Sequence, residues 1–415
     1  MHNRNAVRYY ILLFALFFVM FISNDFGLID VEKTAIVMAV GIDREEDTFI
    51  VTSQIALPAE SGQGASKTTQ MVSRGKTVAE AFEEINDKTG WYPKLVFCKL
   101  ILLGENAVKE NVFDALDFFL RDEYVSEDCL LAVCDGISKD FLNVKTPTNG
   151  VSSVAIQTIL SAHAERVGAV MPNTLREFSA SSFGDSKSGY LPVVKIETPQ
   201  ESIGGETGEP QDPSGGEDQS GGSGGSGSSG GSTGGSGSTG TQPTESEKVF
   251  VVSETATFRE GKQVGLLSKE ETFAFGAMKS DLKLAPYTVE TDGEAYTLTI
   301  KHNAPEVKLS ITDEGVARLK VSVSLTAGIA DFSKAKDENQ IRDVGAVPKK
   351  VLEGAGKKLK GEIEATIKAA NAANCDLLGV TDMLKKYENK YYDAFKKDIL
   401  SRLSVSVKVK FKSIR

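Results

Sequence analysis

The chain has 415 residues, of which 40% are hydrophobic and 25% are charged, a composition typical of folded globular protein. This length is sufficient for two or three domains, each with its own core. The formal net charge of −10 argues against a nucleic-acid partner, because phosphate binding needs a concentrated excess of lysine and arginine.

An uncharged apolar run from Tyr9 to Ile22 dominates the N-terminus. Extending it to residues 7–26 gives about 20 residues, the length that a helix needs to cross a bilayer. The run is followed by no small-residue cleavage pattern and by no nearby cysteine for lipid attachment. The sequence therefore predicts an uncleaved transmembrane signal anchor within residues 1–25. A buried core helix is the alternative, which a segment that is apolar on all sides disfavours.

The charges around this segment predict its orientation. Arg4 and Arg8 precede the run and acidic residues follow it, so the N-terminus is expected in the cytoplasm. The rest of the chain contains no second apolar stretch long enough to span a membrane. We therefore expect a single-pass protein whose bulk, from about residue 26 onward, lies outside the cytoplasm.

A stretch rich in Gly, Ser and Thr occupies residues 204–247. It contains almost no apolar residue, so it cannot bury enough surface to offset the entropy cost of ordering it. We predict a flexible linker between two folded regions, residues 26–203 and residues 248–415. Both regions are expected to have an α+β fold with antiparallel or mixed sheets.

In the first region, the apolar segment Ala35–Ile42 is typical of a strand that is buried on both faces. The charged residues Asp43–Asp47 predict an exposed turn, and Phe49–Leu57 predicts the partner strand of a hairpin. Further along the region, the spacing of apolar residues changes between that of helices and that of strands. It predicts helices near residues 78–85 and 112–120 and strands at 95–103 and 130–134.

The second region begins with an apolar segment at residues 249–252 and continues with strictly alternating segments, which predict an antiparallel sheet. After Pro348, apolar residues recur every three or four positions. This spacing predicts a long helix over residues 351–370 and a shorter one over residues 377–387. Alternation from Leu403 to Phe411 predicts a final strand with one face in water.

The cysteines are expected to be buried thiols rather than disulfides, because free cysteine is among the most buried residue types. Cys129 and Cys134 would lie roughly 16 Å apart on opposite faces of a strand, too far to be bridged. The other two are Cys98 and Cys375.

The sequence offers no pattern of metal ligands. The three histidines, His2, His163 and His302, are scattered, and none lies near a cysteine or carboxylate at ligand spacing. The acidic segment Asp43–Asp47 lacks the glycine and the distal glutamate of a calcium loop. We therefore predict no metal site.

Catalytic motifs are equally incomplete. Gly354–Lys358 lacks the first glycine of a phosphate loop and the Ser or Thr that follows its lysine. Ser280 and Lys283 have the spacing of a Ser/Lys acylase pair, but nothing else of that pattern follows. Trp91–Pro93 fits either a surface contact or a half-buried loop, and the usual burial of such residues favours the loop. We predict that the protein is not an enzyme, with no catalytic or cofactor-binding residues.

Five blocks, in this order along the chain, resemble those of the Ger(x)C family of spore-germination proteins. They are Gly27–Asp30 with Ala35–Asp43, Leu100–Glu105 with Leu116–Asp122, Thr255–Leu267 with Glu270–Thr272, Asp376–Gly379 and the final strand. The sequence also departs from the family pattern. Leu28 stands where the family carries its lipidated cysteine, Ile29 where it has tryptophan, and Cys98 where many members have histidine. The change at Leu28 puts lipidation in doubt and fits an uncleaved anchor.

The resemblance implies a non-catalytic subunit of a nutrient germinant receptor, acting in spore germination at the outer face of the spore inner membrane. It implies two membrane partners, a polytopic permease-like subunit and a second membrane subunit. It also implies an α+β fold in more than one domain and no established catalytic site or cofactor. Composition and periodicity agree with the anchor and the mixed fold, but by themselves they do not indicate germination.

Two other classes of function stay open from the sequence. The first is a membrane-anchored cell-surface protein that binds a small ligand or a wall polymer and is unrelated to sporulation. The second is an anchored hydrolase, which the absence of a catalytic constellation disfavours. Expression confined to vegetative growth would favour the first alternative over a germinant receptor.

Overall fold

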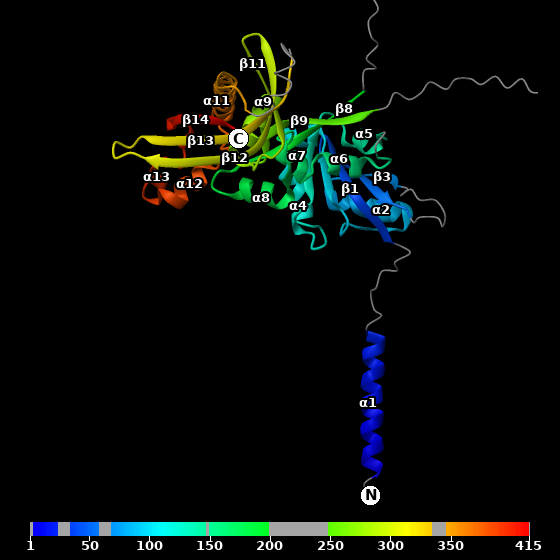
Figure 1. Cartoon of the computed structure of the whole chain (residues 1–415). Helices are drawn as coiled ribbons and strands as arrows, with labels where there is room; N and C mark the ends of the chain where they lie inside the picture. The colour runs from blue at the N-terminus through cyan, green and yellow to red at the C-terminus, as the bar shows by residue number, and fades with distance from the viewer. Residues whose placement is uncertain are drawn as a thin grey trace, which may run out of the picture.

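The computed structural model describes residues 3–23, 34–57, 68–146, 149–198, 248–333 and 346–414 (Figure 1). These residues form a mixed α+β fold built on two sheets, as the sequence predicts. The predicted linker at residues 204–247 lies outside the described residues.

Helix α1 (Asn3–Ser23) contains the apolar run of the N-terminus. The structure describes its side chains from residue 7 to residue 18, and all of them are exposed. The large apolar ones range from 52% exposed at Val7 to 75% at Tyr10. Within the described part of the chain, we find no helix whose length and apolar character suffice to cross a membrane.

The larger sheet contains ten strands, eight of which lie side by side in one continuous order from β10 to β3. The strands are β1 (Thr34–Glu45), β2 (Thr48–Ala56), β3 (Thr68–Gly75), β4 (Tyr92–Lys94), β5 (Leu100–Leu103), β6 (Leu130–Cys134), β7 (Asn173–Thr174), β8 (Ser188–Glu197), β9 (Val249–Arg259) and β10 (Lys262–Leu267). Their order is β10-β9-β8-β6-β5-β1-β2-β3, with β4 paired to β1 and β7 paired to β6.

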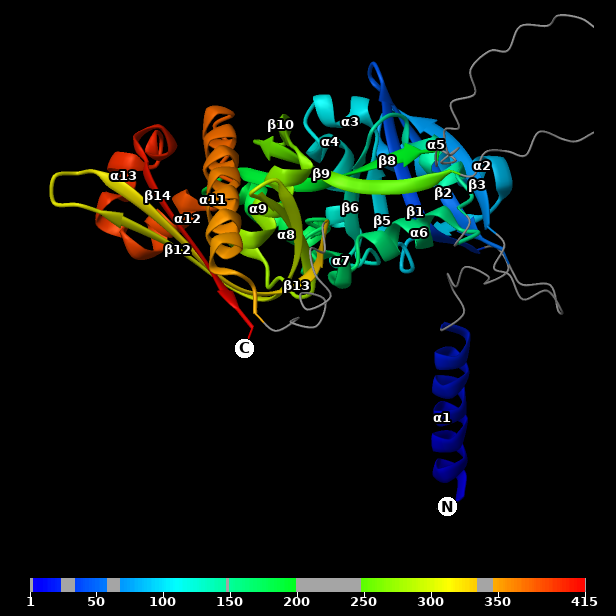
Figure 2. The same cartoon turned by 45° about the horizontal axis from the view of Figure 1, so that its top comes forward.

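Helices cover both faces of this sheet (Figure 2). On one face, α2 (Val78–Thr89), α4 (Phe113–Arg121) and α8 (Leu175–Phe183) contribute to a first hydrophobic core. On the other face, α5 (Ser138–Asn143) and α6 (Ser152–Ile159) contribute to a second core. Two short helices, α3 (Glu105–Lys109) and α7 (Ala162–Arg166), lie in connections.

The two cores explain why the central strands are apolar on both faces. In β5, Ile101 and Leu103 belong to the first core, whereas Leu100 and Leu102 belong to the second. Alternate residues of a strand point to opposite faces, so a strand that is covered on both sides needs a continuous apolar sequence. The prediction of a strand buried on both faces at residues 35–42 is confirmed, although Ile36 is 40% exposed.

Two local predictions in the first region are wrong. Asp43 does not lie in an exposed turn, because β1 continues to Glu45 and the Asp43 side chain is buried. The strand predicted at residues 95–103 is confined to β5, because residues 95–99 form a connection between β4 and β5. Between them the chain turns, and the Cys98 N–H donates to the Leu95 carbonyl at 2.8 Å.

The cysteines are buried and free, as predicted. Cys129 contributes to the first core and Cys134 to the second, so the two thiols point to opposite faces of the sheet. The prediction that they cannot form a disulfide with each other is therefore confirmed.

Strands β8 and β9 pair with each other across the linker. Their antiparallel register runs from Ser188 opposite Arg259 to Glu197 opposite Val249. Buried residues of β9, Ala256 and Phe258, contribute to the first core. The opening strands of the second region therefore complete the sheet of the first region, which the sequence analysis does not anticipate.

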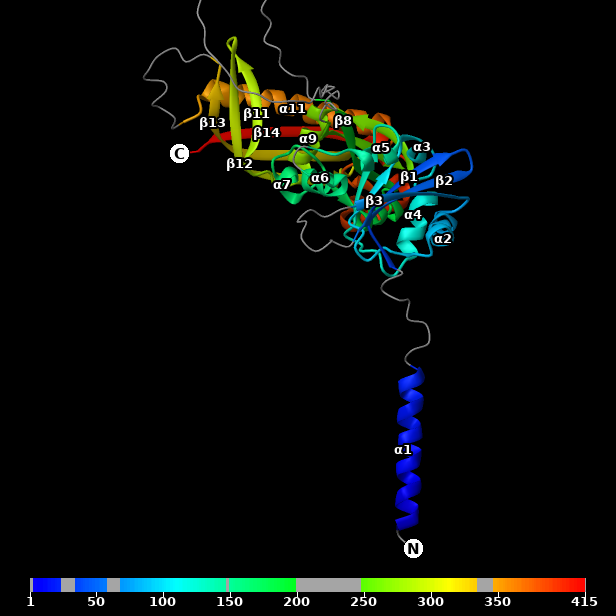
Figure 3. The ribbon, with the colours of Figure 1, turned by 90° about the vertical axis from the view of Figure 1, so that its right-hand side faces the viewer.

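The smaller sheet has four strands in the order β11-β12-β13-β14 and shares one hydrophobic core with the helices around it (Figure 3). Its strands are β11 (Ala285–Thr291), β12 (Glu294–Ile311), β13 (Ala317–Phe332) and β14 (Ser404–Ser413). The helical segments of this region are α9 (Lys269–Lys279), α11 (Lys349–Ala372), α12 (Val380–Tyr387), η2 (Asn389–Tyr391), α13 (Tyr392–Phe395) and η3 (Ile399–Arg402).

Helix α11 confirms the prediction of a long amphipathic helix over residues 351–370, since the apolar positions that recur along it, from Val351 to Ala370, are buried. The sheet of the second region is mixed, which is one of the two arrangements that the sequence analysis expects, although the alternating segments by themselves predicted an antiparallel one. Strand β14 pairs parallel to β13, because the helices between the two strands return the chain to the end of the sheet where β13 begins. Helix α12 begins at Val380 rather than Leu377, because Gly379 adopts a left-handed conformation with φ of 67°.

The pairing of β8 with β9 predicts that the protein survives cleavage of its linker. A protease site inserted within residues 204–247 should yield two fragments that elute together, because the strand pairing and the shared core hold them. Size-exclusion chromatography before and after cleavage checks this. Separate elution under native conditions would instead indicate two independent domains. Elution of the cleaved protein in urea shows where the dissociated fragments run.

Candidate functional site: a polar cleft beside the C-terminal helices

A polar cleft of about 550 Å³ opens where the connection between α8 and β8 meets the C-terminal helical segment. Acidic and basic side chains from both parts line it. The charged residues among them are Asp185, Lys187, Arg259, Glu260, Asp376, Lys396 and Lys397.

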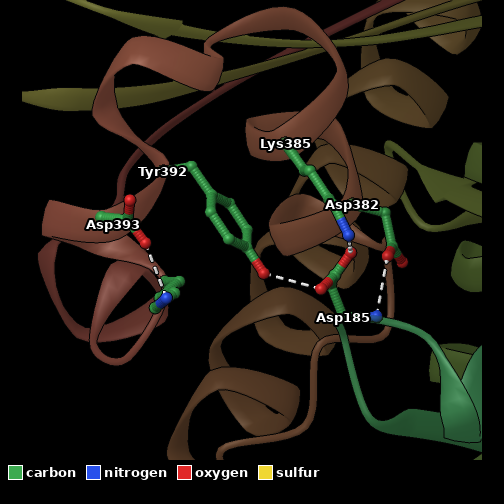
Figure 4. Close-up of polar contacts among 6 residues, drawn as sticks. Asp185, Asp382, Lys385, Tyr392 and Asp393 are labelled. Carbon is green, nitrogen blue, oxygen red and sulfur yellow. Dashed lines mark hydrogen bonds and ion pairs between the residues drawn. The ribbon is translucent and has the colours of Figure 1, made fainter.

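Asp185 lies at the centre of the contacts across this cleft (Figure 4). Its carboxylate accepts a hydrogen bond from the Lys385 ammonium at 2.6 Å and another from the Tyr392 hydroxyl at 2.6 Å. The Asp185 backbone N–H donates to the Asp382 carboxylate at 3.2 Å. One residue of the first region thus contacts three side chains of the C-terminal segment.

The protonation states of these groups follow from their contacts. Hydrogen bonds from Lys385 and Tyr392 lower the pKa of Asp185, and the same Asp185 carboxylate raises the pKa of Lys385. The pKa of the Tyr392 hydroxyl is raised by the same bond, because ionising it would remove the proton that it donates. At neutral pH the carboxylate is charged and the hydroxyl is neutral, as the observed hydrogen bonds require.

Asp376 fixes the start of helix α12 beside the cleft. Its buried carboxylate accepts the backbone N–H groups of Val380 at 2.6 Å and Thr381 at 2.7 Å. Burial raises the pKa of Asp376, while the bonds from Thr381 and Val380 oppose that shift. The carboxylate satisfies two N–H groups of the first turn that have no partner within the helix.

The residues around Asp376 also attach to the larger sheet. The Asp376 N–H donates to the Ser188 hydroxyl at 2.9 Å, and the Cys375 thiol lies 3.4 Å from the Phe258 carbonyl. The Arg259 guanidinium donates to the Asn374 carbonyl. The segment at residues 374–376 is therefore connected to both β8 and β9.

Other charges at the cleft are also paired within the protein. Lys187 pairs with Glu260 at 3.5 Å, and Lys396 pairs with Asp393 at 2.7 Å. Exposed pairs of this kind contribute little to stability individually. The geometry of the cleft is suited to holding the two parts of the protein together and to contacting a polar ligand.

A second buried carboxylate, Asp43, lies inside the first region. It accepts the Ser138 N–H at 2.8 Å and the Ser138 hydroxyl at 2.7 Å, at the start of α5. Burial raises the pKa of Asp43, and the bonds from Ser138 oppose that shift. The predicted acidic turn therefore contains a buried helix-capping residue, which its place directly after an apolar strand could have indicated.

Two glycines leave room for this carboxylate and its partner. A Cβ atom at Gly104 would overlap the Asp43 carboxylate, and one at Gly41 would overlap the Ser138 hydroxyl. Gly41, Asp43 and Gly104 all lie in sequence blocks on which the family resemblance rests. These parts of the motifs are therefore explained by close packing inside the protein.

The other candidates of the sequence analysis are not brought together. The Ser280 hydroxyl donates to Glu165 at 2.7 Å, whereas Lys283 pairs with Asp281 at 2.7 Å. His302 is exposed and lies 3.6 Å from Asp281. Among the described residues, no group of three or more His, Cys, Asp or Glu side chains is arranged to hold a metal ion.

Two family models match the chain. Residues 28–196 match the spore germination protein N-terminal domain, and residues 253–415 match the C-terminal model described as spore germination B3/GerAC-like. Together the two matches cover most of the chain, in the order in which the Ger(x)C family carries these domains. The chain belongs to this spore-germination family.

A curated relative and a solved structure agree with membership of the Ger(x)C family. Spore germination protein B3 of Bacillus subtilis (strain 168) is 28% identical over 170 residues, which cover 39% of this chain and 44% of the relative. The aligned part is thus less than half of that relative's length. The crystal structure of the GerBC protein matches with a TM-score of 0.50 and 16% identity, covering 91% of this chain and 97% of that one. This likeness shows a common fold.

Substitution of Gly104 tests the tight packing around Asp43. Gly104→Ala should lower the free energy of unfolding by about 1–3 kcal/mol or more, because the added methyl group must displace a buried carboxylate. Urea denaturation followed by circular dichroism measures the change. Gly150→Ala is the matched control, since a Cβ there meets no atom within 4 Å. Equal stability of the two variants would contradict the packing argument.

The bonds of Asp185 predict a pH-dependent contribution to stability. The pKa of Asp185 is lowered in the folded protein, so its contribution is complete above the unfolded pKa of about 3.9 and is lost as the pH falls through the folded value. Asp185→Asn should therefore be less stable than the wild type at pH 7, with a difference that shrinks below about pH 4.

Urea denaturation at several pH values between neutrality and pH 3 measures this difference. Tyr392→Phe, which removes one of the two bonds and leaves the Lys385 pair, should show a smaller loss at pH 7. A difference between wild type and Asp185→Asn that stays constant over this range would contradict the assignment.

Proposed function

We propose that the protein is a non-catalytic subunit of a nutrient germinant receptor, acting at the outer face of the spore inner membrane. The match of both regions, in order, to the two spore-germination domains is the observation that carries this proposal. The name of the curated relative likewise refers to germination.

In this proposal, α1 anchors the protein as a single-pass helix and the rest of the chain lies outside the cytoplasm. The support for this anchor comes from α1 itself and from the residues that precede its apolar run. The side chains described in α1, residues 7–18, are all exposed, and none of them belongs to the three described hydrophobic cores. Burial of such a surface in hydrocarbon is favourable. The basic residues that precede the run support the orientation.

The partners in this proposal are a polytopic permease-like subunit and a second membrane subunit. The pairing of β8 with β9 and the contacts of Asp185 make the two regions one connected body. A subunit built in this way presents a fixed surface to its partners. This property is consistent with a role in assembling a receptor complex and does not require catalytic chemistry.

Deletion of the gene tests the proposal. Spores that lack it should release less of their core solutes when exposed to the germinant, and a restored wild-type gene should recover the release. The experiment requires a strain with no second receptor for the same germinant. A restored gene that carries Gly150→Ala should behave like wild type, because a Cβ added there meets no atom of the described structure within 4 Å. Unchanged release in the deletion strain would refute the proposal.

One observation favours a second candidate function, a membrane-anchored protein that binds a small ligand or a wall polymer outside sporulation. The cleft beside Asp185 has a volume of about 550 Å³ and a polar lining, which is suited to such a ligand. The deletion experiment separates the two functions. Normal germination together with expression confined to vegetative cells would support the second.

A further inference from the structure

A group of exposed apolar and aromatic side chains lies at the end of the first region where the described chain enters β1. The members of this aromatic patch are Ile36, Tyr92, Val96, Phe97 and Tyr124, which are 40%, 41%, 46%, 57% and 53% exposed. Large apolar side chains on a water-soluble surface usually occur singly, so a group of five indicates a contact surface.

Backbone pairing brings the members of the aromatic patch together. Strand β4 runs parallel to the start of β1, with Tyr92 opposite Thr34 and Lys94 opposite Ile36. The Lys94 ammonium lies over the ring of Tyr124, 5.2 Å from its centroid. Val96 and Phe97 lie on the turn that directly follows β4. Figures 1 and 3 show the start of β1 and the connection after α4 at the same end of the molecule.

The covering of the sheet explains why this group is exposed. Ala35 and Val37 point into the first core, under the helices of that face. Ile36 points to the opposite face, where the second core includes Ala39 further along β1 and does not include Ile36. The helices α5 and α6 therefore cover the middle of the strand and leave its beginning open.

The charges around the aromatic patch do not favour an anionic surface. Lys94 and Lys99 lie close to it in the sequence, but so do four acidic residues between α4 and β6. These are Asp122, Glu123, Glu127 and Asp128. The chemistry of the patch is instead that of the bilayer interface, where tyrosine and tryptophan rings are enriched at the level of the lipid headgroups.

The chain connectivity places this patch close to the membrane if α1 is the anchor. Only residues 24–33 separate the end of α1 from the start of β1, and ten residues span at most about 35 Å. Tyr92 lies opposite the first residue of β1. The aromatic patch therefore lies beside the point where the connection from α1 enters the first region.

We propose that the aromatic patch rests on the headgroup region of the bilayer and fixes the orientation of the folded regions above it. This inference depends on the proposed membrane anchor. The occupant is a zwitterionic lipid surface, and contact arises from the aromatic and apolar side chains rather than from charge.

The chain contains a single tryptophan, Trp91, directly before Tyr92, and its fluorescence reports on the patch. Trp91 is half-buried and packs against the first core. The full chain is reconstituted into phosphatidylcholine vesicles that carry bromine at a shallow or a deep acyl position. Shallow bromine should lower Trp91 emission roughly twofold and deep bromine much less, because the patch beside Trp91 is proposed to lie at the depth of the headgroups. Added salt should leave the quenching unchanged.

The variant Tyr92→Ser/Phe97→Ser should abolish most of the quenching, because it removes two exposed rings of the patch. Neither side chain belongs to a buried core, so the variant is expected to fold, which circular dichroism checks. Leu266→Ser is the matched control. Leu266 is 52% exposed on β10, which is separated from β1 by four strands in the sheet. Quenching of Trp91 should therefore persist in this control variant.

Retention of the protein in vesicles after an alkaline wash distinguishes the two proposals. Retained protein with unquenched Trp91 would overturn the lipid contact and leave the anchor standing. A third outcome is that Trp91 is unquenched in vesicles but protected from aqueous quenchers in spore membranes. This outcome would overturn the lipid contact in favour of a protein partner. Protein that washes off the vesicles would overturn the anchor and the lipid contact together.

Discussion

The antiparallel pairing of β8 with β9 is the interaction on which the architecture depends. It joins the last described strand before the linker to the first strand after it, so one ten-stranded sheet contains segments from both halves of the chain. Residues of β9 complete the first core, and the C-terminal segment at residues 374–376 bonds to both β8 and β9. The polar cleft exists because this pairing brings Asp185 to the C-terminal helices.

Buried carboxylates provide a second common feature. Asp43 and Asp376 each accept backbone N–H groups at the start of a helix, and each lies in a block that resembles the Ger(x)C family. A buried charge is costly unless hydrogen bonds compensate it, so neighbouring residues must meet exact steric demands. Gly104 next to Asp43 is one such case. Two of the blocks that resemble the family thus contain residues that maintain the interior of the protein.

Much of the candidate site was beyond prediction from the sequence. Asp185 lies in a polar connection, and nothing in its local sequence distinguishes it from other exposed aspartates. Its partners Lys385 and Tyr392 follow it by about two hundred residues, so only the folded chain reveals the contact. Asp376 was easier to single out from the sequence, because it belongs to a block that resembles the family. Even there, the sequence predicted a helix from Leu377 and did not identify the cap.

Element types could be predicted from the sequence where burial imposes a clear period of apolar residues. The long helix α11, the strand at residues 35–42 and the buried cysteines follow from such patterns, because one side chain after another must face the same core. The pairing of strands across the linker and the parallel arrangement of β14 and β13 became visible only in the folded chain. These features depend on contacts between residues far apart in the chain, and local periodicity contains no information about them.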